Sequence, residues 1–295
     1  MRTAIIAALC ALLLGLGGCS ALRLGYAAGP DIVYWWLDGY IDFTGAQTPR
    51  ARDAIRQWFA WHRREQVPEY AALLVRAQAE VRADVTPARV CEWQGEVLKR
   101  ARSAFEKIAP DAAEMMLTIT PQQVKHLEAR YDKFNAQYRD DYLQSDPRQR
   151  ADEALKRVVE RAEMLYGRLS DAQRERIVEG LKRSPFDPEL WLAERRARQQ
   201  DALQILRRVG AGDGATREQA LAELRGYVER LQRSPRENYR RYNERLAEFN
   251  CSFAAALHDS MSAAQRRTAA ERLAGWEADL RAIAAGTDPT PAAAN

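Results

Sequence analysis

Side chains that commonly carry catalysis are sparse in this chain. None of its three histidines, His62, His126 and His258, belongs to an HExxH motif or pairs with cysteine at zinc-site spacing. The nucleophile motif Gly-x-Ser-x-Gly and the phosphate-binding loop pattern do not occur in the sequence. Neighbouring acids such as Asp140 and Asp141 point to different faces of a helix, which indicates solvated surface. We therefore expect a protein that is not an enzyme and that uses no cofactor or metal.

One histidine lies in a stretch dense in aromatic and basic side chains, Trp58-Phe-Ala-Trp-His-Arg-Arg-Glu65. A binding site around His62 is one interpretation. The other is an amphipathic helix in which Trp58 and Trp61, three residues apart, both face the core. We favour the second. For His258, a place near the end of a helix predicts hydrogen bonds to terminal carbonyl groups.

The chemistry that the sequence indicates most clearly is lipidation. Residues 1–18 carry one arginine and then an apolar run, which is shorter than the about 20 residues that span a bilayer and is typical of a cleavable export signal. Four residues resemble a bacterial lipobox: Leu16, Gly17, Gly18 and Cys19. This resemblance implies cleavage before Cys19 and a triacylated cysteine, which gives stable membrane anchoring. Position 20 is Ser rather than Asp, and among Gram-negative lipoproteins this resembles the class that is sorted to the outer membrane.

Cys10 is expected to leave with the signal peptide and Cys19 to be acylated, which leaves Cys91 and Cys251 unmodified. An exported protein enters an oxidising compartment, which favours a disulfide between them. Such a bond would close a loop of about 160 residues and stabilise the fold by up to about 5 kcal/mol in the chain-entropy treatment. The alternative is two separate buried thiols, which behave as small hydrophobic side chains. We favour the disulfide.

Charge and hydropathy exclude two classes of partner for the processed chain. The net charge of the whole chain before processing is +4, but acids and bases are finely mixed and no block of five like charges occurs. We therefore expect no nucleic-acid partner, because that would require clustered basic residues. No later segment is apolar enough to cross a bilayer. Contact with the membrane is expected only through the N-terminal acyl chains.

Helix signals dominate the processed chain. Ala, Leu, Glu, Arg and Gln are abundant, and strand or hairpin signals are nearly absent. Ser/Thr-x-x-Gln segments predict capping boxes that begin at Thr120, Ser170, Thr216 and Ser262. Thr86 to Arg89 is a partial copy with arginine in the glutamine position. Prolines, Pro110 among them, also mark expected helix starts.

Apolar residues spaced by three and four follow each expected start. The sequence predicts an all-α fold, an antiparallel multi-helix bundle or array of about ten helices after a cleaved signal peptide. The expected organisation is a signal peptide at 1–18, a lipidated tether at 19–29, a single all-helical domain at 30–283 and a disordered tail at 284–295.

An aromatic stretch begins twelve residues after Cys19 and runs from Asp31 to Phe43. On a helical wheel of about 100° per residue its acids form one narrow stripe, and apolar residues fill most of the rest. Such a helix is usually buried, and a helix at the membrane surface would normally show Lys or Arg. We expect the first core helix here, with Asp38 or Asp42 meeting an arginine; contact with the bilayer is the alternative. The side chains expected to be buried are Trp35, Trp36, Leu37 and Tyr40.

Several segments resemble a family of Gram-negative outer-membrane lipoproteins that is classified only as a domain of unknown function. These segments are Leu22-Arg23-Leu24-x-Tyr26, Trp35-Trp36-Leu37-Asp38-x-Tyr40-x-Asp42, Trp61-His62-Arg63-Arg64 with Pro68-x-Tyr70, Thr86-Pro87-x-x-Val90-Cys91, and Asn250-Cys251 followed by Leu257-His258. No activity comes with the resemblance, so it implies no catalytic residue.

A second resemblance concerns the helix starts. Ile119 to Gln123 and Leu169 to Gln173 are similar to the Leu-Thr-x-x-Gln motif of the Spy/CpxP periplasmic chaperones, although capping alone explains this spacing. We expect an envelope lipoprotein at the periplasmic face of the outer membrane, which acts as a non-enzymatic structural or interaction module. Its partner would be an envelope protein or the cell wall. The alternative is a chaperone that holds unfolded clients.

Overall fold

The structure is a computed structural model, which describes residues 19–210 and 214–286. Helices and their connections make up all of this part of the chain, so the all-α prediction is confirmed. The helices are α2 (Cys19–Ala27), α3 (Gly29–Ile41), α4 (Gln47–Trp61), the π-helical turn η1 (His62–Gln66), α5 (Val67–Glu80), α6 (Pro87–Met116), α7 (Pro121–Tyr142), α8 (Pro147–Tyr166), α9 (Asp171–Arg183), α10 (Pro188–Val209), α11 (Arg217–Gln232), α12 (Glu237–Asp259) and α13 (Ala263–Ala284).

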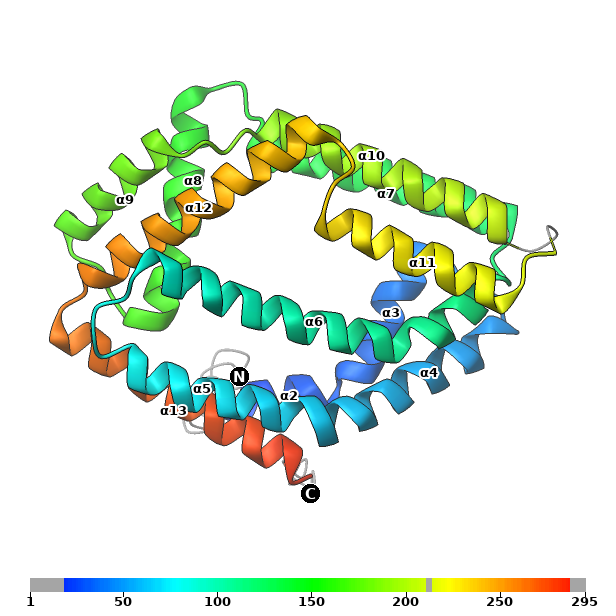
Figure 1. The fold of residues 1–295 in the computed structure, drawn as a ribbon, viewed down its shortest axis with the longest axis horizontal. Helices are drawn as coiled ribbons and strands as arrows, with labels where there is room; N and C mark the ends of the chain where they lie inside the picture. The colour runs from blue at the N-terminus through cyan, green and yellow to red at the C-terminus, as the bar shows by residue number, and fades with distance from the viewer. Residues whose placement is uncertain (1–18, 211–213, 287–295) are drawn as a thin grey trace, which may run out of the picture.

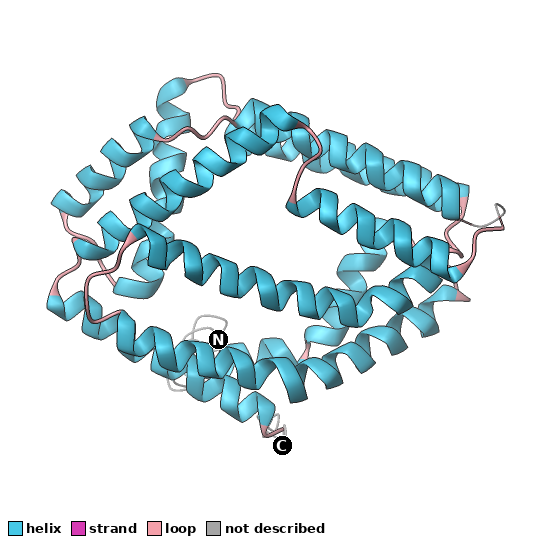
Figure 2. Cartoon of the chain, in the orientation of Figure 1, coloured by secondary structure: helices cyan, strands magenta, loops and turns pink. Residues whose placement is uncertain are grey.

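The helices form a ring rather than a solid bundle (Figure 1). One side holds α5 and α13, the next α4, then α7 with α10, and the last side α8, α9 and α12 (Figures 1 and 2). The longest helix, α6, runs across this arrangement and packs against α4, α11 and α12. The ring closes where α13 packs against α2, α5 and α8. Helices from the two ends of the chain thus lie side by side.

The hydrophobic core is divided to match this shape. It consists of five separate clusters, each with three to six buried residues between neighbouring helices. Tyr34 with Ala51 and Ile55, for example, joins α3 to α4. No single cluster gathers side chains from all sides of the ring, so each helix is held mainly by its immediate neighbours.

The predicted capping boxes are present at all four starts, those of α7, α9, α11 and α13. In each, the hydroxyl accepts from the backbone N–H three residues on, and the glutamine side chain accepts from the backbone N–H of the capping residue. The partial copy also forms its half of the motif, because Thr86 Oγ1 accepts from the N–H of Arg89 at 3.2 Å. A further box before α4 was missed: Thr44 and Gln47 exchange the same two bonds at 2.9 and 3.4 Å.

Two pairs of boxes are joined to each other through their glutamines. Gln173 and Gln265 donate to each other's Oε1 at 2.8 and 2.9 Å, which links the starts of α9 and α13. Gln47 and Gln123 do the same at 3.2 and 2.6 Å, which links α4 to α7. We call these two contacts the amide pairs. They turn a local capping motif into a connection between helices that are distant in sequence.

The prediction for the aromatic stretch is wrong at its two tryptophans. Trp35 is 65% exposed and Trp36 is 60% exposed, whereas Tyr34 between α3 and α4 is the buried aromatic. Leu37 and Tyr40 are half-buried. A helix that is apolar around most of its circumference is buried only if neighbours cover every side, but α3 packs mainly against α2, α4 and α7, and Trp35 and Trp36 stay exposed.

The expected arginine partner also belongs to a different acid. Asp31 forms the ion pair, with Arg52 at 2.8 Å. Asp38 instead accepts from the backbone N–H of Phe43 at 3.0 Å and so fastens the end of α3. Neither Asp38 nor Asp42 forms an ion pair with arginine within residues 19–210 and 214–286. Asp42 ends the helix in a left-handed conformation, with φ of 58°.

Three further expectations need correction or lie outside the described residues. The segment expected to be a tether forms the helix α2, which packs against α13. Pro110 lies inside α6 rather than at a helix start. Proline has no N–H to donate within a helix, but Ala109 and Ala113 beside it are completely buried, so packing supports α6 at this point. Residues 16–18 of the lipobox and residues 287–295 of the tail lie outside the described part.

Candidate binding cleft

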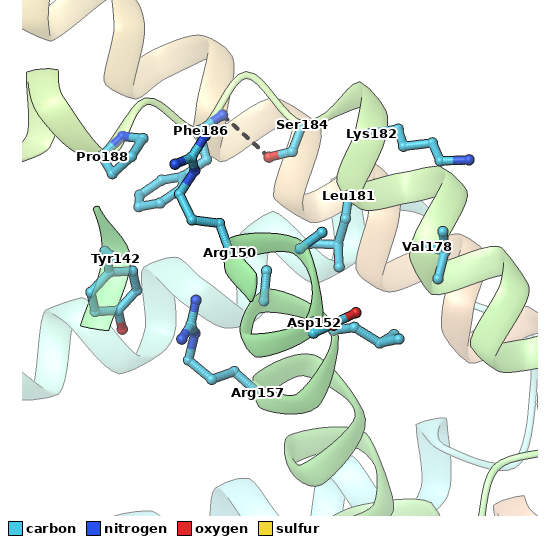
Figure 3. A pocket seen from close by; sticks show the side chains of 13 residues that line it. Tyr142, Arg150, Asp152, Arg157, Val178, Leu181, Lys182, Ser184, Phe186 and Pro188 are labelled. Carbon is cyan, nitrogen blue, oxygen red and sulfur yellow. Dashed lines mark hydrogen bonds between the residues drawn. The ribbon is translucent and has the colours of Figure 1, made fainter. Parts of the chain in front are cut away.

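A cleft of about 370 Å³ lies where the end of α7, the start of α8, α9 and the loop before α10 meet (Figure 3). Helix α8 contributes one wall and α9 the other, because these two helices pack against each other. The loop from Ser184 to Pro188 forms the end of the cleft. A volume of this size lies within the range of about 300–1,000 Å³ that small-ligand sites usually have.

The floor of the cleft is apolar. Val178 and Leu181 are three residues apart on α9 and so share one face of that helix, opposite Leu155 on α8. Phe186, which is 40% exposed, and Tyr142 at the end of α7 continue the apolar surface (Figure 3). Their rings meet edge to face with centroids 6.3 Å apart.

Two arginines of α8 stand on one side of this floor. Arg157 donates to the backbone carbonyl of Asp141 at 3.3 Å, and its guanidinium lies 4.4 Å from the centroid of the Tyr142 ring. Arg150 donates to the backbone carbonyl of Gln144. Both therefore bind carbonyl groups near the C-terminal end of α7, where the helix dipole favours positive charge.

These two arginines keep hydrogen-bonding capacity for a ligand. Neither Arg150 nor Arg157 forms an ion pair with a carboxylate in the part of the chain that the structure describes. A guanidinium has five N–H donors, and the contacts given above use few of them. The third cation of the lining, Lys182, is paired with Glu179 at 2.7 Å, and this hydrogen bond lowers the pKa of that carboxyl. The one acid that lines the cleft is Asp152.

The cleft has the chemistry of a binding site. An apolar floor takes up an apolar group by removing it from water, and the arginines beside it form charge-assisted hydrogen bonds with a carboxylate or phosphate. No histidine or cysteine lines it. Among the described residues no group of His, Cys, Asp and Glu is arranged to hold a metal ion. None of the described helices has the length and apolar character needed to cross a membrane.

The aromatic and basic stretch around His62 forms a separate cluster. The imidazole stacks on Trp58 at 4.6 Å between centroids, and its Nδ1 lies 3.0 Å from the hydroxyl of Tyr26 on α2. Burial lowers the pKa of His62 below its ordinary value. Trp58 and Trp61 are half-buried rather than in the core, so the expected core position is only partly correct. The π-helical turn that begins at His62 is a feature often found at functional sites.

The other two histidines hold helices together. His258 is buried; its Nε2 donates to the carbonyl oxygen of Ala83 at 2.7 Å, and Nδ1 lies 2.8 Å from the hydroxyl of Tyr166. It thus binds a carbonyl group, but one from the loop before α6 rather than from its own helix end. Nε2 of His126 lies 3.2 Å from the carbonyl oxygen of Gly39.

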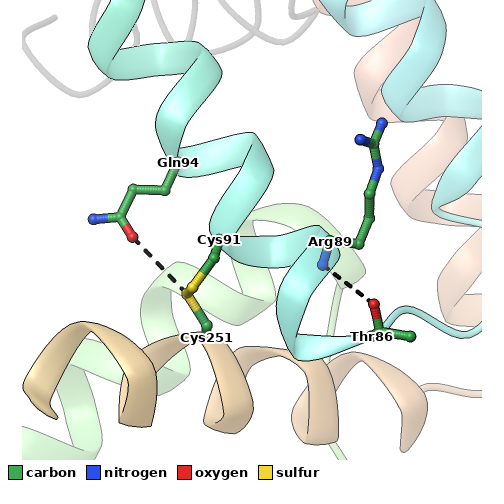
Figure 4. Close-up of a disulfide and its surroundings, with 5 residues drawn as sticks. All are labelled: Thr86, Arg89, Cys91, Gln94 and Cys251. Atoms are coloured by element: carbon green, nitrogen blue, oxygen red, sulfur yellow. Dashed lines mark hydrogen bonds between the residues drawn. A yellow bond between two sulfur atoms is a disulfide. The ribbon is translucent and has the colours of Figure 1, made fainter. Parts of the chain in front are cut away.

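Cys91 and Cys251 are bonded (Figure 4). Sγ of Cys91, at the start of α6, and Sγ of Cys251, in α12, lie 2.01 Å apart across a sequence separation of 160. Oε1 of Gln94 lies 3.9 Å from Cys251 Sγ; this is a contact rather than a hydrogen bond, because a disulfide sulfur has no proton to donate. The predicted disulfide is confirmed, and it joins α6 to its neighbour α12.

The sequence profile of a family of unknown function, DUF6279, matches residues 39–240. The chain belongs to this family. No curated protein and no solved structure matches the chain. The part matched to DUF6279 contains the whole cleft, whereas Trp35, Trp36 and Cys251 lie outside it.

Sequence reasoning did not find the cleft of this DUF6279 member. The signal it overlooked is Ser184-Pro-Phe-Asp-Pro188, a short loop between two helices that holds a large apolar residue between two prolines. Such loops run over the surface, so an aromatic residue there is exposed unless another element covers it. The role of Arg150 and Arg157 could not be found in the same way, because arginine is spread along the whole chain.

Proposed function

We propose that the protein is a lipid-anchored lipoprotein at the periplasmic face of the outer membrane and acts there as a non-enzymatic interaction module. The address rests on the sequence: the export-signal pattern of residues 1–18, the lipobox-like residues that end at Cys19, and Ser20 after it. Mass spectrometry of the N-terminal peptide from membranes tests this address. Three acyl chains on Cys19 are expected, and an unmodified cysteine would contradict the anchor.

We propose further that the cleft between α8 and α9 binds a segment of an envelope protein that carries an acidic side chain next to a large apolar one. One observation supports this proposal: among the described residues, Arg150 and Arg157 have no carboxylate partner, and they lie beside an apolar floor. The floor would accept the apolar side chain, and the guanidinium groups would bind the acid. This pairing of interactions selects against segments that are only apolar or only acidic.

A labelled peptide of alternating Leu, Phe and Glu residues tests the cleft by fluorescence anisotropy. The double variant Arg150→Gln, Arg157→Gln is expected to bind at least about tenfold more weakly, since hydrogen bonds to charged groups contribute about 1.5–3 kcal/mol. The matched control is Arg148→Gln, Arg161→Gln, which removes the same charge from exposed positions of the same helix. Equal weakening in both variants would mean that only net charge matters.

A second variant protects this test against a folding defect, because both cleft arginines also bind carbonyl groups of α7. Val178→Glu leaves the arginines in place and puts a negative charge on the floor. This charge repels the glutamates of the acidic peptide and should abolish its binding. A peptide with Lys in place of Glu should not bind the unchanged protein. Binding of both peptides with equal affinity would refute the proposed chemistry.

The alternative is a chaperone that holds unfolded clients, and a second cleft favours it. About 250 Å³ lies between α3, α4 and α6, and its lining is almost entirely apolar, with the adaptable side chains of Met115 and Met116 in it. Suppression of aggregation of an unfolded client at substoichiometric protein is the expected result for a chaperone. No suppression at several-fold excess would leave only the interaction module.

A further inference from the structure

Exposed apolar side chains are concentrated at one end of the chain. Ten large apolar side chains are exposed in the described residues, and five of them lie in α2 and α3. These five are Leu22, Leu24, Ile32, Trp35 and Trp36. Leu22 and Leu24 lie on opposite flanks of Arg23 and so do not share one side of α2. We call the other three, Ile32, Trp35 and Trp36 of α3, the apolar face. The other five are spread over α5, α6, α8 and the loop before α10, so no comparable group exists elsewhere in this part of the chain.

The packing of α3 does not use the apolar face. The helix contacts α4 through Tyr34, Val33 and Leu37, on the side of the Tyr34 cluster. Ile32 and Trp36, four residues apart, share the opposite side with Trp35. Neither indole N–H of the two tryptophans forms a hydrogen bond to protein in the described structure. Each ring is therefore an exposed apolar body with an available donor, the property that concentrates tryptophan at membrane interfaces.

The two acids of α3 nearest the apolar face already have partners within the protein. The carboxylate of Asp31 is paired with Arg52 at 2.8 Å, and the Arg52 guanidinium lies 3.8 Å from the centroid of the Tyr34 ring. The carboxylate of Asp38 fastens the end of its own helix. Residues 32–37 contain no charged side chain. A surface of this kind fits the interfacial region of a bilayer, where apolar acyl chains meet headgroups rich in hydrogen-bond acceptors. It does not fit an acidic or basic protein partner.

The position of the apolar face agrees with a lipid partner. Cys19 begins α2, and Trp36 follows 17 residues later. At about 1.5 Å per helical residue, the two Cα atoms lie no more than about 26 Å apart. Acyl chains on Cys19 would hold the start of α2 at the bilayer surface, so the apolar face would lie within reach of the same surface.

From these observations we propose that the apolar face of α3 lies in the interfacial region of the bilayer in which Cys19 is anchored. This inference rests on the proposed lipid anchor for its membrane. It adds a second attachment, which would fix one edge of the ring against the lipid and turn the cleft between α8 and α9 away from it. The lipid recognised is a zwitterionic or weakly anionic glycerophospholipid, because the face carries no cationic group.

The first test uses the processed chain, residues 19–295, with Cys19→Ser, which removes the acyl chains. Flotation with phosphatidylethanolamine and phosphatidylglycerol vesicles measures the bound fraction. Trp35→Ala, Trp36→Ala should reduce partitioning at least tenfold. The matched control is Val97→Ala, Leu98→Ala, an adjacent pair on α6 with exposed fractions of 60% and 55%. Equal binding of the two double variants would overturn the proposal.

The second test removes any dependence on weak partitioning. Cys19 is the one thiol left in the processed chain once Cys91 and Cys251 are bonded, so it can be coupled to a maleimide lipid in vesicles. Lipids brominated near the headgroup should then quench part of the fluorescence of the seven tryptophans. Trp35→Phe, Trp36→Phe should remove this quenching. No quenching of the unchanged chain, or equal quenching of both, would overturn the proposal.

The two tests separate this inference from the lipid anchor itself. Both use protein whose attachment at Cys19 is absent or chemical, so their results do not depend on acylation in the cell. If Cys19 from membranes is unmodified, the proposal of a lipid anchor fails, but the two tests still measure the affinity of the apolar face for lipid. If Cys19 is triacylated but the lipids do not quench the tryptophans, the proposal of a lipid anchor stands and that of the apolar contact fails.

Discussion

At the scale of single residues, the most constrained charge is Glu194 on α10. Its side chain is buried, 3% exposed, and accepts from Arg198 at 2.8 Å and from Arg236 at 2.7 Å. Burial alone would raise the pKa of this carboxyl, but hydrogen bonds from Arg236, Ser234 and Arg198 outweigh it and lower the pKa. The ionised carboxylate of Glu194 on α10 therefore binds Arg236, which lies in the connection between α11 and α12.

We predict that Glu194→Gln destabilises the protein by roughly 2 kcal/mol at neutral pH, below the about 3–5 kcal/mol of fully buried pairs because both guanidiniums partly reach water. The folded state holds the carboxyl ionised to a lower pH than the unfolded chain does. Its contribution is therefore complete above the ordinary value of 4.5 and is lost as the pH falls further. Urea unfolding across pH 3–7 should show the two proteins converging under acid conditions.

The matched control for this prediction is Glu237→Gln on α12. Glu237 also pairs with an arginine, Arg241, but both side chains are more than 60% exposed. Exposed pairs contribute little, so no measurable change in the unfolding midpoint is expected at any pH. An equal loss in both variants would show that the burial of Glu194 is irrelevant.

At the scale of elements, the amide pairs give the helix starts a second role. A glutamine in an isolated capping box serves only its own helix, as Gln219 does at α11. Gln173 is buried, and besides its own box it donates to Gln265 and to the carbonyl of Ser260. The relative placement of α9 and α13 thus depends on Gln173 and Gln265, although the sequence motif of each predicts only the start of its own helix.

We predict that Gln173→Ala and Gln265→Ala are each more destabilising than Gln219→Ala, whose loss should be about 1 kcal/mol for one cap. The two paired substitutions should not add. A coupling energy of about 0.5–3 kcal/mol is expected from a double-mutant cycle measured by urea unfolding. Additive losses would mean that the two boxes stabilise their helices independently.

Much of the element scale could be predicted from the sequence, since capping is local chemistry. The boxes at Thr120, Ser170, Thr216 and Ser262 were expected and found. The start near Pro49 was expected, but the box at Thr44 was missed because Thr44-Gly-Ala-Gln47 ends before this proline. The pairing of glutamines could not be predicted, because it depends on which helices meet. The exposure of Trp35 could not be predicted for the same reason: apolar periodicity shows which face can pack, but not whether a neighbour covers it.

At the scale of the whole molecule, the disulfide connects parts that the small core clusters do not join. Replacing both Cys91 and Cys251 with alanine should destabilise the protein by up to about 5 kcal/mol in the chain-entropy treatment, and by less if the reduced unfolded chain stays compact. Thermal and urea unfolding measure the loss.

The unchanged protein treated with a reductant provides the control, because it loses the bond and keeps both side chains. It should lose about as much stability as the double variant. Two titratable thiols in the untreated processed chain, other than Cys19, would show that the bond does not form and would contradict the prediction.

The ring shape itself was outside the reach of the sequence. Composition and periodicity predicted helices in about the right number, and these are present. They could not show that the core would divide into five clusters, because every helix carries an apolar face whichever partner it finds. The cleft follows from the ring, since it lies where α8 and α9 meet the ends of α7 and α10.

The closure of the ring by α13 sets an order of events in time. This helix covers the apolar surface of α5 around Val81 with Ala269, Ala270 and Leu273, yet it is synthesised after the other described helices. Until it arrives, the surface of α5 stays open to water and to other nascent chains, a state that favours aggregation. Loss of α13 through a premature stop codon should therefore produce an insoluble product rather than a shortened ring.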